Sequence, residues 1–212
     1  MPETLTSRRG KPSWVTTLAR ILMIVAGSAA ILLPAWLPDR PSTPIEQGTV
    51  EMLQAILLAA SAAVVLGASS HAKSYRPICY ILGLGLIAAL VGEIEDFVSG
   101  ILGWNFPQNW LIGLILLVAL IIAAKNRKIT RRFFAELGYH AGAGLIAAAL
   151  LISYVFNKVI GSQAFWEASL GPAFSPTVPQ VCKSYLELLA CYLIFVGSLG
   201  LSITMARRIE PN

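Results

Sequence analysis

Long apolar runs, separated by short polar links, are the feature that most constrains the fold of this chain of 212 residues. The hydrocarbon core of a bilayer is about 30 Å thick, so a spanning helix needs roughly 20 mostly apolar residues. Six runs approach or exceed this length, and they cover residues 21–37, 52–68, 78–102, 110–124, 137–159 and 185–206. In lipid every backbone polar group must be satisfied within the segment, which favours helices. The sequence therefore predicts an all-α, polytopic integral membrane protein with six transmembrane helices.

Composition excludes the main alternatives. Charged residues make up 13% of the chain, whereas soluble domains average roughly 25%, and 56% of the residues are hydrophobic. A soluble globular domain and a disordered chain do not fit these values. The runs also lack the alternation over about ten residues that is typical of β-barrel strands.

The predicted organisation is one membrane domain with short polar ends. Residues 1–20 form a basic N-terminal arm, residues 21–206 the six-helix domain, and residues 207–212 a tail. The first run follows Arg8, Arg9 and Lys11, as the apolar part of a signal peptide would, but it is longer than the usual 7–15 residues. We therefore expect a retained first helix.

The distribution of basic residues predicts the orientation. Of the sixteen Lys and Arg residues, thirteen fall on one side of a six-span arrangement, in the N-terminal arm, the second and fourth links and the C-terminal tail. Short cytoplasmic loops are enriched in Lys and Arg, so both termini are expected in the cytoplasm. The chain is then a multi-pass protein of the cell membrane, either a plasma membrane or a bacterial inner membrane.

The densest basic segment is Lys125–Arg132. Its pattern is typical of a topology anchor, and an alternative is binding of anionic lipid at about 1 kcal/mol per charge. Because membrane topology explains the net charge of +5, nucleic acid is not an expected partner. Membrane lipids are the expected partners.

Acidic residues within the third run provide the main functional hypothesis. Glu93, Glu95 and Asp96 are expected to lie within the membrane, with Asp96 roughly 12 Å from the interface that Trp104 marks. Glu93 and Asp96 are three residues apart and share a helix face, whereas Glu95 points away from Glu93. Charges at such depth are costly and usually functional.

Further polar residues are expected at the same end of the bundle. If the helices pack antiparallel and compactly, the sequence predicts an outward-facing acidic pocket. Its candidate members are Glu51, Gln54, Glu93, Glu95, Asp96, Glu187 and the cation Lys158.

Three functions are compatible with this pocket. The leading hypothesis is binding or passage of a cation, a proton or a polar solute, and carboxylate and amide oxygens also suit a hard divalent cation. The first alternative is an enzyme acting on a lipid-linked substrate, with Glu93 and Asp96 as acid and base. The second is a non-catalytic accessory subunit of a membrane complex, in which the polar groups only hold helices together.

Glu136 and His140 form a secondary candidate site, because a spacing of four residues places them on one face of a helix. Such a pair can bind a metal or relay protons, but pairing of Glu136 with a neighbouring Arg is the favoured interpretation. Gly138 and Gly142 form a GxxxG pattern that Gly144 and Ala148 extend. This face of small residues suits close helix packing, within the chain, in a homo-oligomer or with a partner subunit.

Several cofactors are not expected. Only two histidines, His71 and His140, are present, and His71 falls in a link, so a haem held by two membrane histidines is excluded. No glycine pattern of a nucleotide site is present. The three cysteines form no CxxC pair and are expected to be buried, apolar side chains.

Overall fold

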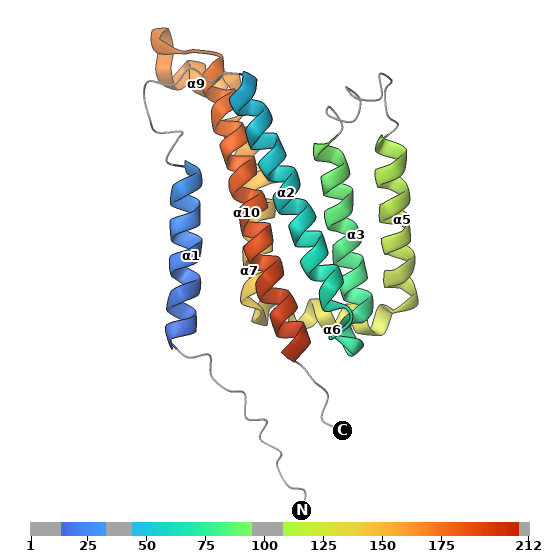
Figure 1. Cartoon of the computed structure of the whole chain (residues 1–212). Coiled ribbons are helices and arrows are strands. Elements are labelled where there is room, and N and C mark those ends of the chain that lie inside the picture. The colour runs from blue at the N-terminus through green and yellow to red at the C-terminus, as the bar shows by residue number, and fades with distance from the viewer. Residues whose placement is uncertain (1–13, 33–43, 95–107, 208–212) are drawn as a thin grey trace, which may run out of the picture.

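The structure is a computed structural model that describes residues 14–32, 44–94 and 108–207. These residues are helical apart from short turns, and none of them lies in a strand. The long helices stand side by side, as Figure 1 shows. They are α1 (Trp14–Leu32), α2 (Pro44–Ala68), α3 (Arg76–Glu93), α5 (Gln108–Lys125), α7 (Ala141–Leu151) and α10 (Thr177–Arg207). The shorter elements are η2 (Lys73–Tyr75), α6 (Arg127–Glu136), η3 (Leu137–Tyr139), η4 (Ile152–Phe156), α8 (Asn157–Ile160), α9 (Gln163–Leu170) and η5 (Gly171–Ala173).

The structure confirms an all-helical protein with helices that can cross a membrane. Five such segments are long and apolar enough in the described residues, and they are Gly48–Ala68, Arg76–Glu93, Gln108–Lys125, Gly142–Ile160 and Thr177–Met205. The first helix contains a shorter apolar stretch, Ile21–Ile31. A sixth span and the orientation of the termini stay predictions.

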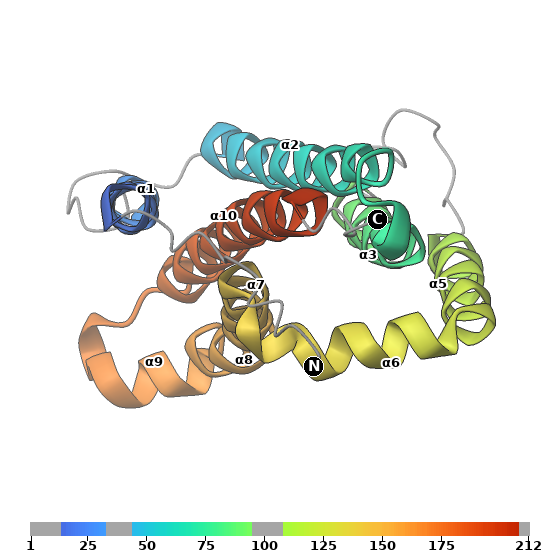
Figure 2. The ribbon, with the colours of Figure 1, turned by 90° about the horizontal axis from the view of Figure 1, so that it is seen from below.

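Helix α10 is the centre of the bundle. It packs against α2, α7 and α1, while α2 also packs against α3, and α3 against α5. The view along the bundle in Figure 2 shows α5 at one edge and α1 at the other. The side chains of α5 are almost all at least partly exposed, so within one copy of the chain lipid is the natural environment for this helix.

Glycines allow the closest helix approaches. A Cβ atom on Gly142 of α7 would lie 2.5 Å from the carbonyl oxygen of Gly197 in α10, so only glycine fits there. Gly27 of α1 likewise makes room for the ring of Tyr192, whose hydroxyl donates a hydrogen bond to the Met23 carbonyl at 2.7 Å. Gly138 and Gly144, the other two glycines of the predicted small face, have no neighbour within 4 Å of such an added atom. Their use by another chain therefore stays a prediction.

The fifth predicted span, residues 137–159, corresponds to the segment Gly142–Ile160, but its first residues do not belong to the same helix. Helix α6 crosses the end of the bundle at a steep angle to the spanning helices (Figure 2). A short 3₁₀ turn follows, and His140 then adopts an extended conformation, with φ −104° and ψ 113°, before α7 begins at Ala141. Helix α7 continues through a π-helical segment, η4, into α8.

Other helix ends differ from the predicted ones. Helix α2 begins at Pro44 and α10 at Thr177, both earlier than expected, because polar residues are tolerated at helix ends beyond the apolar run. Pro179 lies within the first turn of α10, where its missing N–H costs no hydrogen bond. Helix α3 ends at Glu93, and residues 95–102 of the predicted third span lie outside the described residues.

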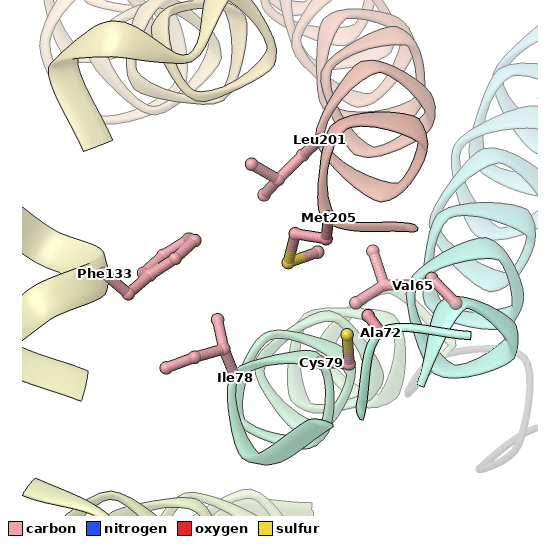
Figure 3. Packing of buried hydrophobic residues seen from close by; sticks show 8 residues of the cluster. Val65, Ala72, Ile78, Cys79, Phe133, Leu201 and Met205 are labelled. Atoms are coloured by element: carbon pink, nitrogen blue, oxygen red, sulfur yellow. The ribbon is translucent and has the colours of Figure 1, made fainter. Parts of the chain in front are cut away.

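A core of buried apolar side chains joins four elements at the end of the bundle where α6 crosses. Figure 3 shows Phe133 of α6 directed towards Ile78 of α3 and Leu201 of α10. Val65, Ala68 and Ala72 complete the core from α2 and the turn after it, and Met205 and the buried Cys79 from α10 and α3. This end of the molecule is therefore held together by apolar packing. The expectation of buried cysteines is confirmed for Cys79 and Cys191.

Candidate functional site

Carboxylates from three helices come into electrostatic range of one another at the end of the bundle opposite to α6. The carboxylate of Glu93, the last residue of α3, interacts with those of Glu187 in α10 and Glu51 in α2, and with the ammonium of Lys183. In Figure 1 the starts of α2 and α10 and the end of α3 are all at the upper end of the bundle, opposite to α6. We call this group the acidic site, and it consists of Glu51, Glu93, Asn157, Lys183 and Glu187.

Glu187 is the most firmly held member of the acidic site. Its Oε1 accepts a hydrogen bond of 2.7 Å from Nδ2 of Asn157 in α8. The Nζ atom of Lys183, one turn earlier in α10, lies 3.8 Å from the same oxygen. The oxygen of the same Asn157 amide, Oδ1, is buried and has no hydrogen-bond partner in the described part of the chain. Glu187 therefore holds a fixed position, with an unused acceptor beside it.

Glu93 and Glu51 are held less firmly. Both side chains are exposed, and neither forms a hydrogen bond or ion pair with a residue that the structure describes. Helix α3 has 18 residues and is about 27 Å long, so it just crosses the hydrocarbon core. Glu93 is the last residue of this helix, and the expected depth of its carboxylate in the membrane stays a prediction. Glu95 and Asp96, the other two acids, lie outside the described residues.

Gln54 has a structural contact. Its side chain is 1% exposed, and its Nε2 donates a hydrogen bond of 3.2 Å to the backbone carbonyl of Ser184. It therefore ties α2 to α10 just below the acidic site. Glu51, three residues earlier, was expected on the same helix face. In the structure Glu51 is exposed, whereas Gln54 is buried against α10.

The cation nearest to the carboxylates is Lys183, whereas the sequence pointed to Lys158. Lys158 is exposed and pairs with no described carboxylate. Lys183 and Asn157 are the two members of the site that the prediction omitted. The spacing of four residues between Lys183 and Glu187 is the signal that could have found the first, because such pairs meet on a helix surface. For Asn157 the signal is its place at the outer end of the fifth predicted span, next to Lys158.

The described members of the acidic site do not form a group of metal ligands. The described residues contain no group of three or more His, Cys, Asp or Glu side chains that could hold one ion together. Without Glu95 and Asp96, the site is a region of negative potential, with three carboxylates against one ammonium. A region of this kind attracts cations without fixing one in a dry ligand shell.

The secondary candidates Glu136 and His140 are separated by the break before α7. Glu136 accepts hydrogen bonds from Arg132 Nε at 3.1 Å and from the Tyr75 hydroxyl at 3.3 Å, as expected for a structural pair. The ring of His140 is buried and stacks on that of Phe133, with the centroids 6.4 Å apart. His71 is exposed, and its Nδ1 lies 2.8 Å from the Ser70 hydroxyl. Among the described residues, neither histidine belongs to a group of three or more His, Cys, Asp or Glu side chains that could hold a metal ion.

Comparisons with known proteins identify no relative. No protein-family model, no curated protein and no solved structure matches the chain significantly. The proposal for its function therefore rests on the geometry of the site.

Proposed function

We propose that this protein binds a cation, a proton among them, at the acidic site and passes it into or across the membrane. One observation carries the proposal: carboxylates from α2, α3 and α10 interact electrostatically at one end of a bundle of membrane-spanning helices. Bringing like charges together from three helices is unfavourable unless a positive partner is present. Lys183 supplies only one such partner.

Glu93 is the expected acceptor. It is exposed, lies at the end of α3, and forms no hydrogen bond or close ion pair with a described residue. Glu187, oriented by Asn157 and balanced by Lys183, acts as the fixed charge that raises the local concentration of cations. Because the described carboxylates form no group that could hold one ion together, a proton or a hydrated monovalent cation fits this arrangement better than a divalent ion held by direct ligands.

Flux into proteoliposomes tests the proposal. Wild-type protein is reconstituted into vesicles loaded with a pH-sensitive dye, and a potassium diffusion potential drives proton entry. We expect acidification faster than in protein-free vesicles, and at least a tenfold lower protein-dependent rate for Glu93→Gln. The same vesicles with an imposed sodium gradient and a sodium-sensitive dye distinguish the two ions.

Glu167→Gln is the matched control, because Glu167 is an exposed acid on α9 at the same end of the molecule. It should retain the wild-type rate. The proposal is wrong if wild-type protein conducts neither ion and its unfolding temperature responds to neither pH nor sodium. It is also wrong if Glu93→Gln and Glu167→Gln behave alike.

The cell membrane is the proposed location, with the acidic site on the outer face. The basic residues at the opposite end of the bundle support this orientation through the positive-inside rule. The enzyme alternative requires Asp96 beside Glu93, and Asp96 lies outside the described residues, so no observation favours it.

A further inference from the structure

Helix α6 is placed where the end of a transmembrane bundle meets lipid headgroups. Helix α5 ends at Lys125, and the side chain of Asn126 closes it by donating a hydrogen bond of 2.9 Å to the Ile122 carbonyl. Helix α6 then crosses the end of the bundle from α5 to α7 (Figure 2). Because it begins where a membrane span ends and runs across the spanning helices, α6 lies along the membrane surface.

The two sides of α6 differ sharply. Ile129 and Phe133 face the core, where Phe133 is 2% exposed. The four basic residues of α6 are all exposed, and at about 100° per residue they occupy one arc of roughly 140°. They are Arg127, Lys128, Arg131 and Arg132. We call this arc the basic face.

Most of the charge on the basic face is not neutralised within the described protein. Glu136 is the acid of α6, and it pairs with Arg132 and accepts a bond from Tyr75. Arg127, Lys128 and Arg131 have no ion pair with a described carboxylate. A neighbouring anion from outside the chain would therefore find three available cations.

An exposed aromatic side chain borders the basic face. Phe134 is 59% exposed, and its position on the helix is about 20° from that of Arg127. Phenylalanine beside Lys and Arg on a helix that lies along the membrane surface is the pattern of interfacial helices, in which the ring enters the acyl region and the cations remain among the headgroups. A basic segment that served only as a topology anchor would need charge but no such arrangement.

We propose that the basic face of α6 binds the phosphate groups of anionic phospholipids in the membrane that holds the bundle. Guanidinium groups donate paired hydrogen bonds to phosphate oxygens, and Lys128 adds a point charge. Each basic residue near an anionic surface contributes favourably, so three available cations give selectivity for anionic over zwitterionic lipid. Since Phe133 connects α6 to α3 and α10, bound lipid stabilises the whole inner end of the bundle.

Thermal unfolding of the purified full chain tests this proposal. Cys79 is 0% and Cys191 6% exposed, so a thiol-reactive fluorophore reports unfolding as these side chains become accessible. Phosphatidylglycerol added to the detergent-solubilised protein should raise the unfolding temperature by several degrees more than phosphatidylcholine. Because the interaction is between charges at a surface, 0.5 M NaCl should reduce this difference by at least half.

Two variants distinguish phosphate recognition from general effects. The triple variant Arg127→Gln, Lys128→Gln, Arg131→Gln should lose at least half of the phosphatidylglycerol shift while unfolding cooperatively in phosphatidylcholine. Lys158→Gln, which removes an exposed cation at the opposite end of the bundle, should retain the full shift.

Three outcomes would overturn the proposal. The first is equal stabilisation of the wild type by the two lipids. The second is an unchanged shift in the triple variant. The third is the same stabilisation by inorganic phosphate alone, which would indicate binding of a free anion. If the triple variant does not fold, the double variant Arg127→Lys, Arg131→Lys decides, because it preserves charge and should keep most of the selectivity for phosphatidylglycerol.

Discussion

The contact between α7 and α10 requires a glycine at position 142, which has a hydrogen atom in place of a side chain. On Gly142 an added Cβ would lie 2.5 Å from the Gly197 carbonyl oxygen and 2.7 Å from the Leu201 nitrogen, both of which are backbone atoms that cannot rotate away. We expect Gly142→Ala to destabilise the protein by about 1–3 kcal/mol, as overpacking does elsewhere. Thermal unfolding in one detergent measures this change.

Gly144→Ala is the control for that substitution, since Gly144 is two residues further along the same helix and has open space around it. Its unfolding temperature should equal or slightly exceed that of the wild type, because alanine restricts the unfolded chain more than glycine. Equal losses in the two variants would show that the effect comes from the α7 backbone and not from its contact with α10.

Single residues were only partly predictable. The sequence identified Gly142 as part of a small face, but the pattern could not show that its partner would be Gly197 or that Gly138 would have no neighbour. Sequence spacing indicates the face of a helix and leaves its partner open. For the same reason Gln54 was expected in a pocket, whereas it bonds to the backbone of α10.

At the scale of elements, Phe133 attaches α6 to the rest of the molecule. Its side chain is 2% exposed among side chains of α2, α3 and α10. Its ring packs edge to face on that of Tyr75, with the ring centroids 6.3 Å apart. Phe133→Ala should therefore cost about 3–5 kcal/mol of stability, through lost burial and the cavity left behind. Phe134→Ala, at an exposed ring next in the sequence, should cost less than about 1 kcal/mol.

Limited proteolysis provides a second readout for this pair, because α6 released from the core should be cut between Arg127 and Arg132 by trypsin. Faster cleavage of Phe133→Ala than of Phe134→Ala is expected. Comparable cleavage rates would mean that α6 is held by its connections to α5 and α7, and not by its buried ring.

The spans themselves were predictable because the bilayer requires a minimum length and hydropathy of each spanning helix, and both are read directly from the sequence. The break at His140 was not. The apolar run continues through Leu137, Gly138 and Tyr139, so the hydropathy pattern predicts one uninterrupted segment. The chain changes direction there because Phe133 and the stacked His140 ring place α6 against the core, and this is a tertiary contact.

In the acidic site, the sequence indicated that acids would gather at one end, but which cation would meet them depended on the side of α10 that faces α8.

For the whole molecule, the distribution of charge between the two ends is the feature that sets its orientation. The start of α1, helix α6 and the end of α10 lie at one end of the bundle in Figure 1, whereas α9 and the acidic site lie at the other. Lys125 and the basic face of α6 make the first end strongly positive. By the positive-inside rule this end should be cytoplasmic.

Cysteine labelling of cells that express the full chain tests this orientation. In a background where the three native cysteines are replaced by alanine, Gln163→Cys at the start of α9 should react with a membrane-impermeant maleimide in intact spheroplasts. Ser70→Cys, in the turn after α2, should react only after the membrane is opened. Both positions are exposed in the structure, so accessibility in the folded protein does not bias the comparison. Labelling of Ser70→Cys but not Gln163→Cys in intact spheroplasts would reverse the orientation and place the acidic site on the cytoplasmic face, where it would meet cytoplasmic and not external cations.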